Sequence, residues 1–414
     1  MRIHRKAGLW IVLGGLAACS FAPEYKEPEA TPAPAQYKEA GEWKPAEPAD
    51  SGPRGEWWKM FGDPALDALQ ERVVGANQNL RAALARLDQA RAQTQVARAD
   101  LLPTVTAGPT VTRSRTSINS PRYPNGAPPV GNNFALTADF DYEVDLWGRI
   151  RNQVAAAGAT QQASAADLAT LDLSIRAELV VDYFSLRSLD AQQALLDRTV
   201  YDYAESLRLI QNLYNGGGAA LTDVAQARAQ LETARTQSAD LQLQRDQTEH
   251  AIAVLVGENP SSFSLDARPL PTDFLPPQFA SGSPSELLER RPDIASAERR
   301  VAAANSEIGV ARAAYFPVFS LSGLFGYDST HPSTWLNAPS KMWSIGPTAA
   351  LTVFDAGRHG ALSAQAHAAY DERVADYRNT VLTAYQEVED NLAALRQLQQ
   401  ESVSQSAAVT AVAS

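Results

Sequence analysis

The feature that most constrains the fold is a stretch of thirteen residues, Phe134 to Leu146, in which apolar and other side chains alternate without a break. Every second residue is apolar or aromatic. The residues between them become acidic toward the end of the stretch, and the acids are Asp139, Asp141, Glu143 and Asp145. A repeat of two residues is the period of a β-strand and not of a helix. The sequence therefore predicts a strand with one apolar face and one acidic face.

The chain contains an internal repeat that places this strand in a larger unit. The segment ARADLLPTVTAG, from Ala97, reappears as ARAAYFPVFSLSG, from Ala311, and each copy changes from a helical pattern to a strand pattern at a proline. A second strand follows in both copies and ends in Gly-Arg before a long helical segment. We predict two β-hairpins, over residues 103–147 and 317–355, which belong to repeats over residues 56–275 and 276–414.

The segments that follow the hairpins have the composition of very long helices. Residues 150–214 contain no proline and are rich in Ala, Gln, Arg, Asp and Leu. The triple glycine Gly216-Gly217-Gly218 then predicts a turn, and residues 221–257 return as a second helix. A further helix is predicted over 358–414. Helices of this length with narrow apolar stripes are stable when they pack side by side.

Four strands with an apolar face need a partner. An open sheet edge in lipid leaves unpaired N–H and C=O groups, so only a closed barrel is stable in a membrane. Two chains would supply eight strands and a filled interior, whereas three would supply twelve and a water-filled one. The acidic face favours the twelve-strand barrel. The alternative is a soluble two-sheet domain, but the flanking helices are too hydrophilic to cover its apolar faces.

The N-terminus carries a targeting signal. Residues 1–18 combine a basic start with a short apolar segment, as in a signal peptide, and LAAC ends at Cys19, the only cysteine. LAAC resembles the lipobox of bacterial lipoproteins, which implies acylation of Cys19 and, with Ser20 next, sorting to the outer membrane. An ordinary signal peptide with an incidental cysteine is the alternative. Residues 19–55 are Pro-rich and are predicted to form a lipid-anchored tether or a wrapping strap.

Other classes of function have little support. The net charge of −11 argues against a nucleic-acid binder. The five histidines show no metal-ligand spacing, and no cysteine is available as a ligand, so we expect neither a metal nor a cofactor nor an enzyme.

Several segments resemble one known family. EWWKMFGDPALDAL, the run RRPDI to FPVF over residues 290–319, and LTVFDAGR are similar to the TolC-like outer membrane factors, in particular their lipoprotein (NodT-type) branch. The resemblance implies a mixed α and β fold: a homotrimer whose twelve-strand outer-membrane β-barrel continues into a periplasmic α-barrel made of long helical hairpins.

The resemblance also implies partners and a function. It implies a periplasmic adaptor protein and an inner-membrane efflux pump, and passive conduction of small molecules, such as drugs or other toxic compounds, from these to the outside. The turn between the long helices matches the adaptor-docking tip of the family. The residues it implies for docking are Gly216, Gly217, Gly218, Leu221, Thr222 and Val224.

One departure from the family pattern is visible. After Gly148 the first repeat contains a long helix, a tip and a return helix, whereas after Gly357 the second repeat ends at Ser414, before a second tip or return helix. We therefore expect a truncated chain or a partial record, and the sequence assigns no gate residues. The alternative function is a non-conducting periplasmic coiled-coil lipoprotein.

Overall fold

The computed structural model describes residues 20–28, 55–119, 129–271, 274 and 290–413. These residues form two compact units. The sheet unit comprises the described residues of 1–40, 87–165 and 293–414, and the hairpin unit comprises those of 41–86 and 166–292. The predicted signal peptide and Cys19 lie outside the described residues, as does most of the predicted tether.

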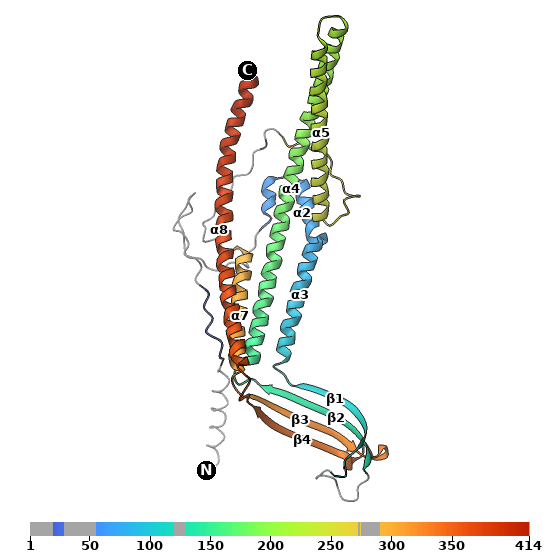
Figure 1. Ribbon diagram of the computed structural model, residues 1–414, viewed down its shortest axis with the longest axis vertical. Coiled ribbons are helices and arrows are strands. Elements are labelled where there is room, and N and C mark those ends of the chain that lie inside the picture. The colour runs from blue at the N-terminus through green and yellow to red at the C-terminus, as the bar shows by residue number, and fades with distance from the viewer. Residues whose placement is uncertain (1–19, 29–54, 120–128, 272–273, 275–289, 414) are drawn as a thin grey trace. The chain divides into compact units, whose positions relative to one another are not determined.

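The elements follow the predicted order of helix, strand, strand and helix in both repeats (Figure 1). In chain order, the helices and strands that contribute to the sheet unit are α3 (Gln78–Ala99), β1 (Thr104–Arg115), β2 (Val130–Val144), α4 (Arg149–Asn215), α7 (Pro292–Ala313), β3 (Val318–Ser329), β4 (Lys341–Ala350) and α8 (Arg358–Ala413). Two short 3₁₀ turns, η2 (Pro332–Thr334) and η3 (Ala338–Ser340), lie in the loop between β3 and β4. Helices α3 and α4 also extend into the hairpin unit.

The four strands form one antiparallel sheet in the order β1-β2-β3-β4. Directly opposite residues share a face, so the pairing register assigns every side chain to one of two faces. The apolar face carries Val105, Ala107, Pro109 and Val111 of β1; Phe134, Leu136, Phe140 and Tyr142 of β2; Leu321, Phe325 and Tyr327 of β3; and Trp343 and Ile345 of β4. The opposite face is mainly serine, threonine and acidic. The predicted two-faced strand is therefore part of a two-faced sheet.

The strand ends differ from the sequence prediction in two places. Strand β2 begins at Val130, four residues before the regular alternation, where it pairs with Arg115. Strand β4 ends at Ala350 and not at 355, because its neighbour β3 begins only at Val318, which is opposite Ala350. Beyond that point the chain continues without a partner strand in the same molecule.

The hairpin unit has an apolar core. It adds η1 (Trp57–Phe61), α2 (Pro64–Ala76) and α5 (Leu221–Leu255) to parts of α3 and α4. Asp63 begins α2 as predicted, since its side chain accepts the Ala65 N–H at 2.9 Å and a proline follows. The core contains Trp58, Leu66, Leu69, Val73, Leu179, Tyr183, Leu186, Ile252 and Val256.

Helices in the sheet unit pack through small residues. Ala156 and Ala163 of α4, Ala297 of α7 and Ala384 of α8 are buried, which allows close approach of the helices. Among the described residues, no helix combines the length and the apolar character needed to cross a membrane.

Candidate functional site

The acidic residues predicted to line a lumen do not share one environment. Asp139 and Asp141 are exposed on the polar face of β2. Asp139 accepts a hydrogen bond from Thr137 Oγ1 at 3.2 Å, and Asp141 accepts one from Ser322 Oγ at 2.8 Å. Neither carboxylate has a cationic partner among the hydrogen bonds and ion pairs found in the described part of the chain. Both carboxylates are therefore exposed to solvent on this face of the sheet.

Glu143 and Asp145, by contrast, are paired with arginines. Glu143 binds Arg149 through two hydrogen bonds, Nε–Oε1 at 2.9 Å and Nη2–Oε2 at 2.6 Å. Asp145 lies one residue beyond β2; it accepts the Arg151 backbone N–H at 2.9 Å and Arg151 Nε at 3.2 Å. The bond to Glu143 raises the pKa of Arg149. These two carboxylates organise the start of α4 and contribute little uncompensated charge.

The sequence prediction did not assign a role to Arg149 or Arg151. Each arginine follows its acid by six residues in EVDLWGRIR, a spacing that spans the turn at Gly148. Gly148 has φ of +77°, a left-handed conformation that L-residues with side chains rarely adopt. The sequence did contain a signal for these two ion pairs: each acid is followed six residues later by an arginine on the other side of the glycine turn.

The predicted docking tip forms the turn between α4 and α5. Gly216 and Gly218 donate backbone hydrogen bonds to Asn212 and Leu213, and Gly217 has φ of +77°. Only Gly217 of the three requires glycine conformationally, since a Cβ at either neighbour would make ordinary contacts.

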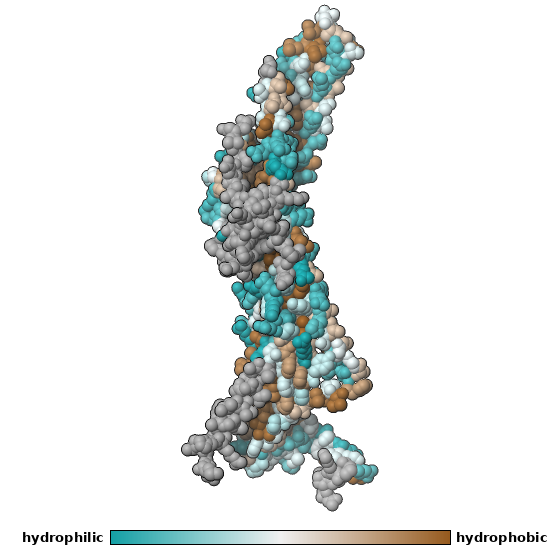
Figure 2. Space-filling model, turned by 90° about the vertical axis from the view of Figure 1, so that its left-hand side faces the viewer, coloured by the Kyte–Doolittle hydropathy of each residue, from teal (hydrophilic) through white to brown (hydrophobic). Residues whose placement is uncertain are grey.

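The side chains after the turn are not equally accessible. Leu221 is 63% exposed and Thr222 is exposed, whereas Val224 is only 4% exposed. Asp223 accepts the Ala220 N–H at 2.9 Å and fixes the start of α5. Figure 2 shows apolar patches among polar ones at this end of the hairpin. Val224 thus packs inside the hairpin, whereas Leu221 and Thr222 are on its surface.

The residues that directly follow Cys19 bind to the sheet unit as a strap, residues 20–28. Phe21 stacks on Phe316 with ring centroids 4.4 Å apart and a 5° interplanar angle, and it also contacts Trp147 at 6.0 Å. Asn305 donates a hydrogen bond to the Pro23 carbonyl at 2.9 Å. The strap therefore contacts residues from both repeats.

Two tyrosines hold the middle of the strap. Tyr25 donates to Glu298 of α7, and Tyr377 of α8 donates to Glu27 at 3.3 Å. Burial, with the nearby negative charge of Glu27 second, raises the pKa of Tyr25 to about 12, and the same two causes raise the pKa of Tyr377 to about 12. Both hydroxyls stay protonated donors at neutral pH. This part of the predicted tether is a strap docked on the protein.

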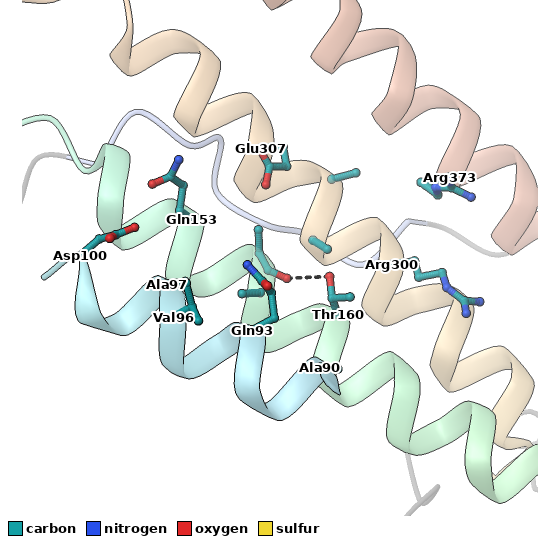
Figure 3. A pocket seen from close by; sticks show the side chains of 14 residues that line it. Ala90, Gln93, Val96, Ala97, Asp100, Gln153, Thr160, Arg300, Glu307 and Arg373 are labelled. Carbon is teal, nitrogen blue, oxygen red and sulfur yellow. Dashed lines mark hydrogen bonds between the residues drawn. The ribbon is translucent and has the colours of Figure 1, made fainter. Parts of the chain in front are cut away.

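A groove lies between the helices of the sheet unit, and six of its fourteen lining residues are alanines (Figure 3). Its volume is about 640 Å³, and Arg300 and Glu307 of α7 and Arg373 of α8 contribute charged side chains. Burial raises the pKa of Glu307. Thr160 Oγ1 donates to the Ala156 carbonyl at 2.9 Å within α4. The lining is typical of a seam between packed helices.

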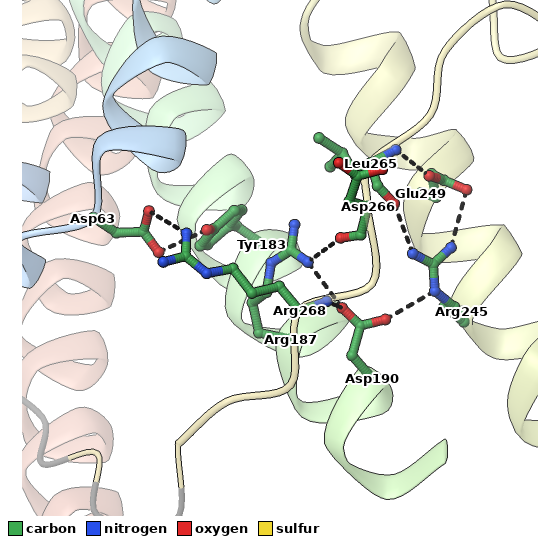
Figure 4. A network of polar contacts seen from close by, with 9 residues as sticks. All are labelled: Asp63, Tyr183, Arg187, Asp190, Arg245, Glu249, Leu265, Asp266 and Arg268. Atoms are coloured by element: carbon green, nitrogen blue, oxygen red, sulfur yellow. Dashed lines mark hydrogen bonds and ion pairs between the residues drawn. The ribbon is translucent and has the colours of Figure 1, made fainter. Parts of the chain in front are cut away.

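The hairpin unit contains a buried network of ion pairs (Figure 4). Asp190 is fully buried and accepts hydrogen bonds from Arg187 Nη1, Arg245 Nε and the Arg268 backbone N–H, each at 2.8 Å. The arginines also donate to carbonyls of the segment after α5, Arg187 to Asp266 at 2.7 Å and Arg245 to Leu265 at 2.8 Å. The network fixes this segment against α4 and α5. In the part of the chain that the structure describes, no group of three or more His, Cys, Asp or Glu side chains is arranged to hold a metal ion.

Comparisons with known proteins identify the family. The family model described as "Outer membrane efflux protein" matches residues 69–258 and 283–413. The chain is 33% identical over 393 residues to the outer membrane protein OprJ of Pseudomonas aeruginosa, covering 93% of this chain and 80% of OprJ. It is also 33% identical over 392 residues to the toluene efflux pump outer membrane protein TtgC of Pseudomonas putida, covering 94% and 80%.

A solved structure agrees with the sequence relatives. The outer membrane channel CmeC of Campylobacter jejuni superposes with a TM-score of 0.83 at 28% identity, covering 92% of this chain and 81% of CmeC. The two-faced four-strand sheet and the long helical hairpin are the parts of a channel subunit of this kind. The chain belongs to the outer membrane efflux protein family.

Proposed function

We propose that this chain is the outer-membrane exit duct of a tripartite efflux system, assembled as a homotrimer. The observation that carries the proposal is the sheet: one exposed apolar face, one Ser/Thr/acidic face, and two edge strands, β1 and β4, that have no outer neighbour in a single chain. Three copies supply twelve strands, enough for a closed barrel with a water-filled interior.

The proposed duct conducts small molecules passively. The polar face lines the lumen, and the apolar face contacts outer-membrane lipid. The driving force comes from an inner-membrane pump, which reaches the duct through a periplasmic adaptor. Transport through such a duct needs no catalysis by this chain.

We further propose where two of these partners meet the chain. The adaptor contacts the turn at Gly216–Gly218 together with Leu221 and Thr222, while Val224 supports the turn from inside. The lipid anchor is an acyl group on Cys19, the residue directly before the docked strap. Cys19→Ala should abolish the lipid-dependent mass increase of the chain. A variant that keeps this mass increase would contradict a lipid on Cys19, and either result leaves the proposed duct and trimer unaffected.

Single-channel recording tests the duct. We expect the purified trimer to give discrete conductance steps in a planar bilayer. A stable trimer without conductance would leave the non-conducting scaffold as the function. The tip is tested separately: Leu221→Ala with Thr222→Ala should reduce cross-linking to the adaptor and drug resistance, whereas the same exchange at Leu243, an exposed residue elsewhere on α5, should not.

A further inference from the structure

The edge strand β4 ends where its in-chain partner ends, yet the strand pattern continues beyond it. The apolar alternation that includes Trp343 and Ile345 continues through Leu351 to Val353. Val353 is 91% exposed and Phe354 is 88% exposed. The backbone N–H and C=O groups of an edge strand need a partner in a membrane, and the first strand, β1, also has an unpaired outer edge.

The internal repeat supplies a template for that partner. Within the chain, the second strand of the first repeat, β2, pairs with the first strand of the second repeat, β3, from Phe134↔Ser329 to Val144↔Phe319. Gly148-Arg149 and Gly357-Arg358 are equivalent, at an offset of 209 residues, and Ala97 and Ala311 are equivalent at an offset of 214. The β2–β3 pairing, which joins the first repeat to the second, therefore serves as a template for how β4 of the second repeat pairs with β1 of the first repeat in another copy.

We propose that β4 pairs with β1 of a second copy in the register that this repeat dictates. Val144 and Phe319 are opposite each other within the chain. The repeat equivalent of Val144 is Val353, 209 residues later, and that of Phe319 is Val105, 214 residues earlier. Val353 is therefore expected opposite the second copy's Val105. The same shifts place Trp343 opposite the second copy's Arg115. This inference rests on the proposed trimer and adds the pairing register at its three subunit boundaries.

The proposed register is consistent with both faces of the sheet. Val353 and the second copy's Val105 both continue apolar faces, and Thr348 lies opposite the second copy's Thr110 on the polar face. A shift of one residue would place apolar side chains on the polar face. A shift of two residues keeps every side chain on its own face. In one direction, however, it places Val353 and Phe354 opposite residues that precede Thr104, where β1 begins.

The same register accounts for exposed apolar residues where strands meet helices. Inside the chain, Trp147 contacts Phe316 at 5.0 Å and donates to the Pro317 carbonyl at 2.7 Å. The repeat equivalent of Phe316 is Leu102, which is 69% exposed in the single chain. The register that places Phe354 opposite the second copy's Thr104 also brings Ala356, the repeat equivalent of Trp147, to the second copy's Leu102.

Cysteine cross-linking in the full-length lipoprotein tests the register. The variant Thr110→Cys with Thr348→Cys places two thiols directly opposite each other, within the Cα separation that a disulfide can span. The matched controls combine Thr110→Cys with Gly346→Cys or with Ala350→Cys, each two residues out of register. Diagonal pairs lie about 7–8 Å apart, beyond that range. The unaltered protein, with Cys19 alone, controls for the native cysteine.

After mild oxidation of membranes, we expect the 110/348 pair to give covalent trimers on a non-reducing gel and both controls to give at least several-fold less. Val105→Cys with Val353→Cys is a second test on the apolar face. Cross-linking by a control pair in preference to 110/348, or by no pair in a protein that still runs as a trimer on a native gel, overturns the register. A protein that is monomeric on the native gel overturns the proposed trimer as well.

Discussion

Arg149 neutralises Glu143 at the point where strand β2 passes into helix α4, with Nη2 2.6 Å from Oε2 and Nε 2.9 Å from Oε1. Arg151 does the same for Asp145, with Nε 3.2 Å from Oδ2. The acidic stretch of the sequence is therefore divided into two exposed carboxylates within the strand and two paired ones at its end.

This division predicts which acids set ion selectivity. Asp139→Asn with Asp141→Asn removes uncompensated charge, so the reversal potential in a salt gradient should move most of the way from the cation value toward zero. Glu143→Gln with Arg149→Gln removes both charges of one ion pair and leaves the net charge of the region unchanged, so the reversal potential should stay near the cation value. Equal shifts from the two double variants would contradict the division.

The strap should depend on the stacked aromatic rings at its start. Phe21→Ala removes contacts with Phe316 and Trp147, and each such aromatic pair contributes about 1 kcal/mol. We expect trypsin to cleave at the exposed Lys26 roughly tenfold faster, since about 1.4 kcal/mol corresponds to a tenfold change in the population of a released strap. Glu24→Ala, at an exposed position of the same strap, is the matched control and should leave the rate unchanged.

A second variant tests strap docking from the opposite side. Gly309 lies where a Cβ would collide with the Asn152 amide and approach the Ala22 Cβ to 2.8 Å. Gly309→Ala should therefore expose Lys26 to trypsin as Phe21→Ala does. If neither variant changes the cleavage rate, the polar contacts of Tyr25 and Tyr377 hold the strap without the aromatic rings.

The buried network should stabilise the hairpin unit far more than a surface ion pair does. Asp190→Asn removes a fully buried charge that three donors share, and breaking a buried pair in this way costs about 3–5 kcal/mol. Glu232→Gln, in an exposed pair with Arg235, should cost less than about 1 kcal/mol. Thermal unfolding in detergent compares them, and similar melting temperatures for both variants would mean that water reaches the network.

Asp63 predicts an acid-dependent loss of stability in the hairpin unit. Burial alone would raise the pKa of Asp63, but hydrogen bonds from Tyr183 and from the Ala65 and Leu66 backbone hold it below its usual value. Because the folded pKa is the lower one, the associated stability is complete above the unfolded pKa of about 3.9 and is lost as pH falls through the folded pKa.

Tyr183→Phe removes the 2.6 Å hydrogen bond to Asp63 and should bring the folded pKa closer to the unfolded one. Acid titration followed by circular dichroism should then show the loss of structure beginning at a higher pH than in the unaltered protein. A carboxyl carbon NMR titration of Asp63 measures the shift directly. An unchanged pKa in the variant would assign the depression to the backbone donors alone.

Much of the architecture is a local property of the sequence and could be read from it. The alternation in Phe134–Leu146, the Asp63-Pro64 helix start and the turn at Gly216–Gly218 each depend on side chains a few residues apart, and the structure has a strand, a helix start and a turn there. The internal repeat, visible as shared segments, correctly implied two hairpins. Family membership followed from motifs that extend over most of the chain.

The tertiary structure decided the roles of individual side chains within these elements. Alternation alone could not distinguish Asp141, which bonds Ser322, from Glu143, whose charge Arg149 neutralises, because the difference depends on the turn at Gly148. Nor could it show that Val224 is buried or that Phe21 stacks on Phe316, almost three hundred residues away. Periodicity determines which face a residue occupies, whereas its charge partner and its exposure depend on contacts between segments far apart in the chain, and these exist only after folding.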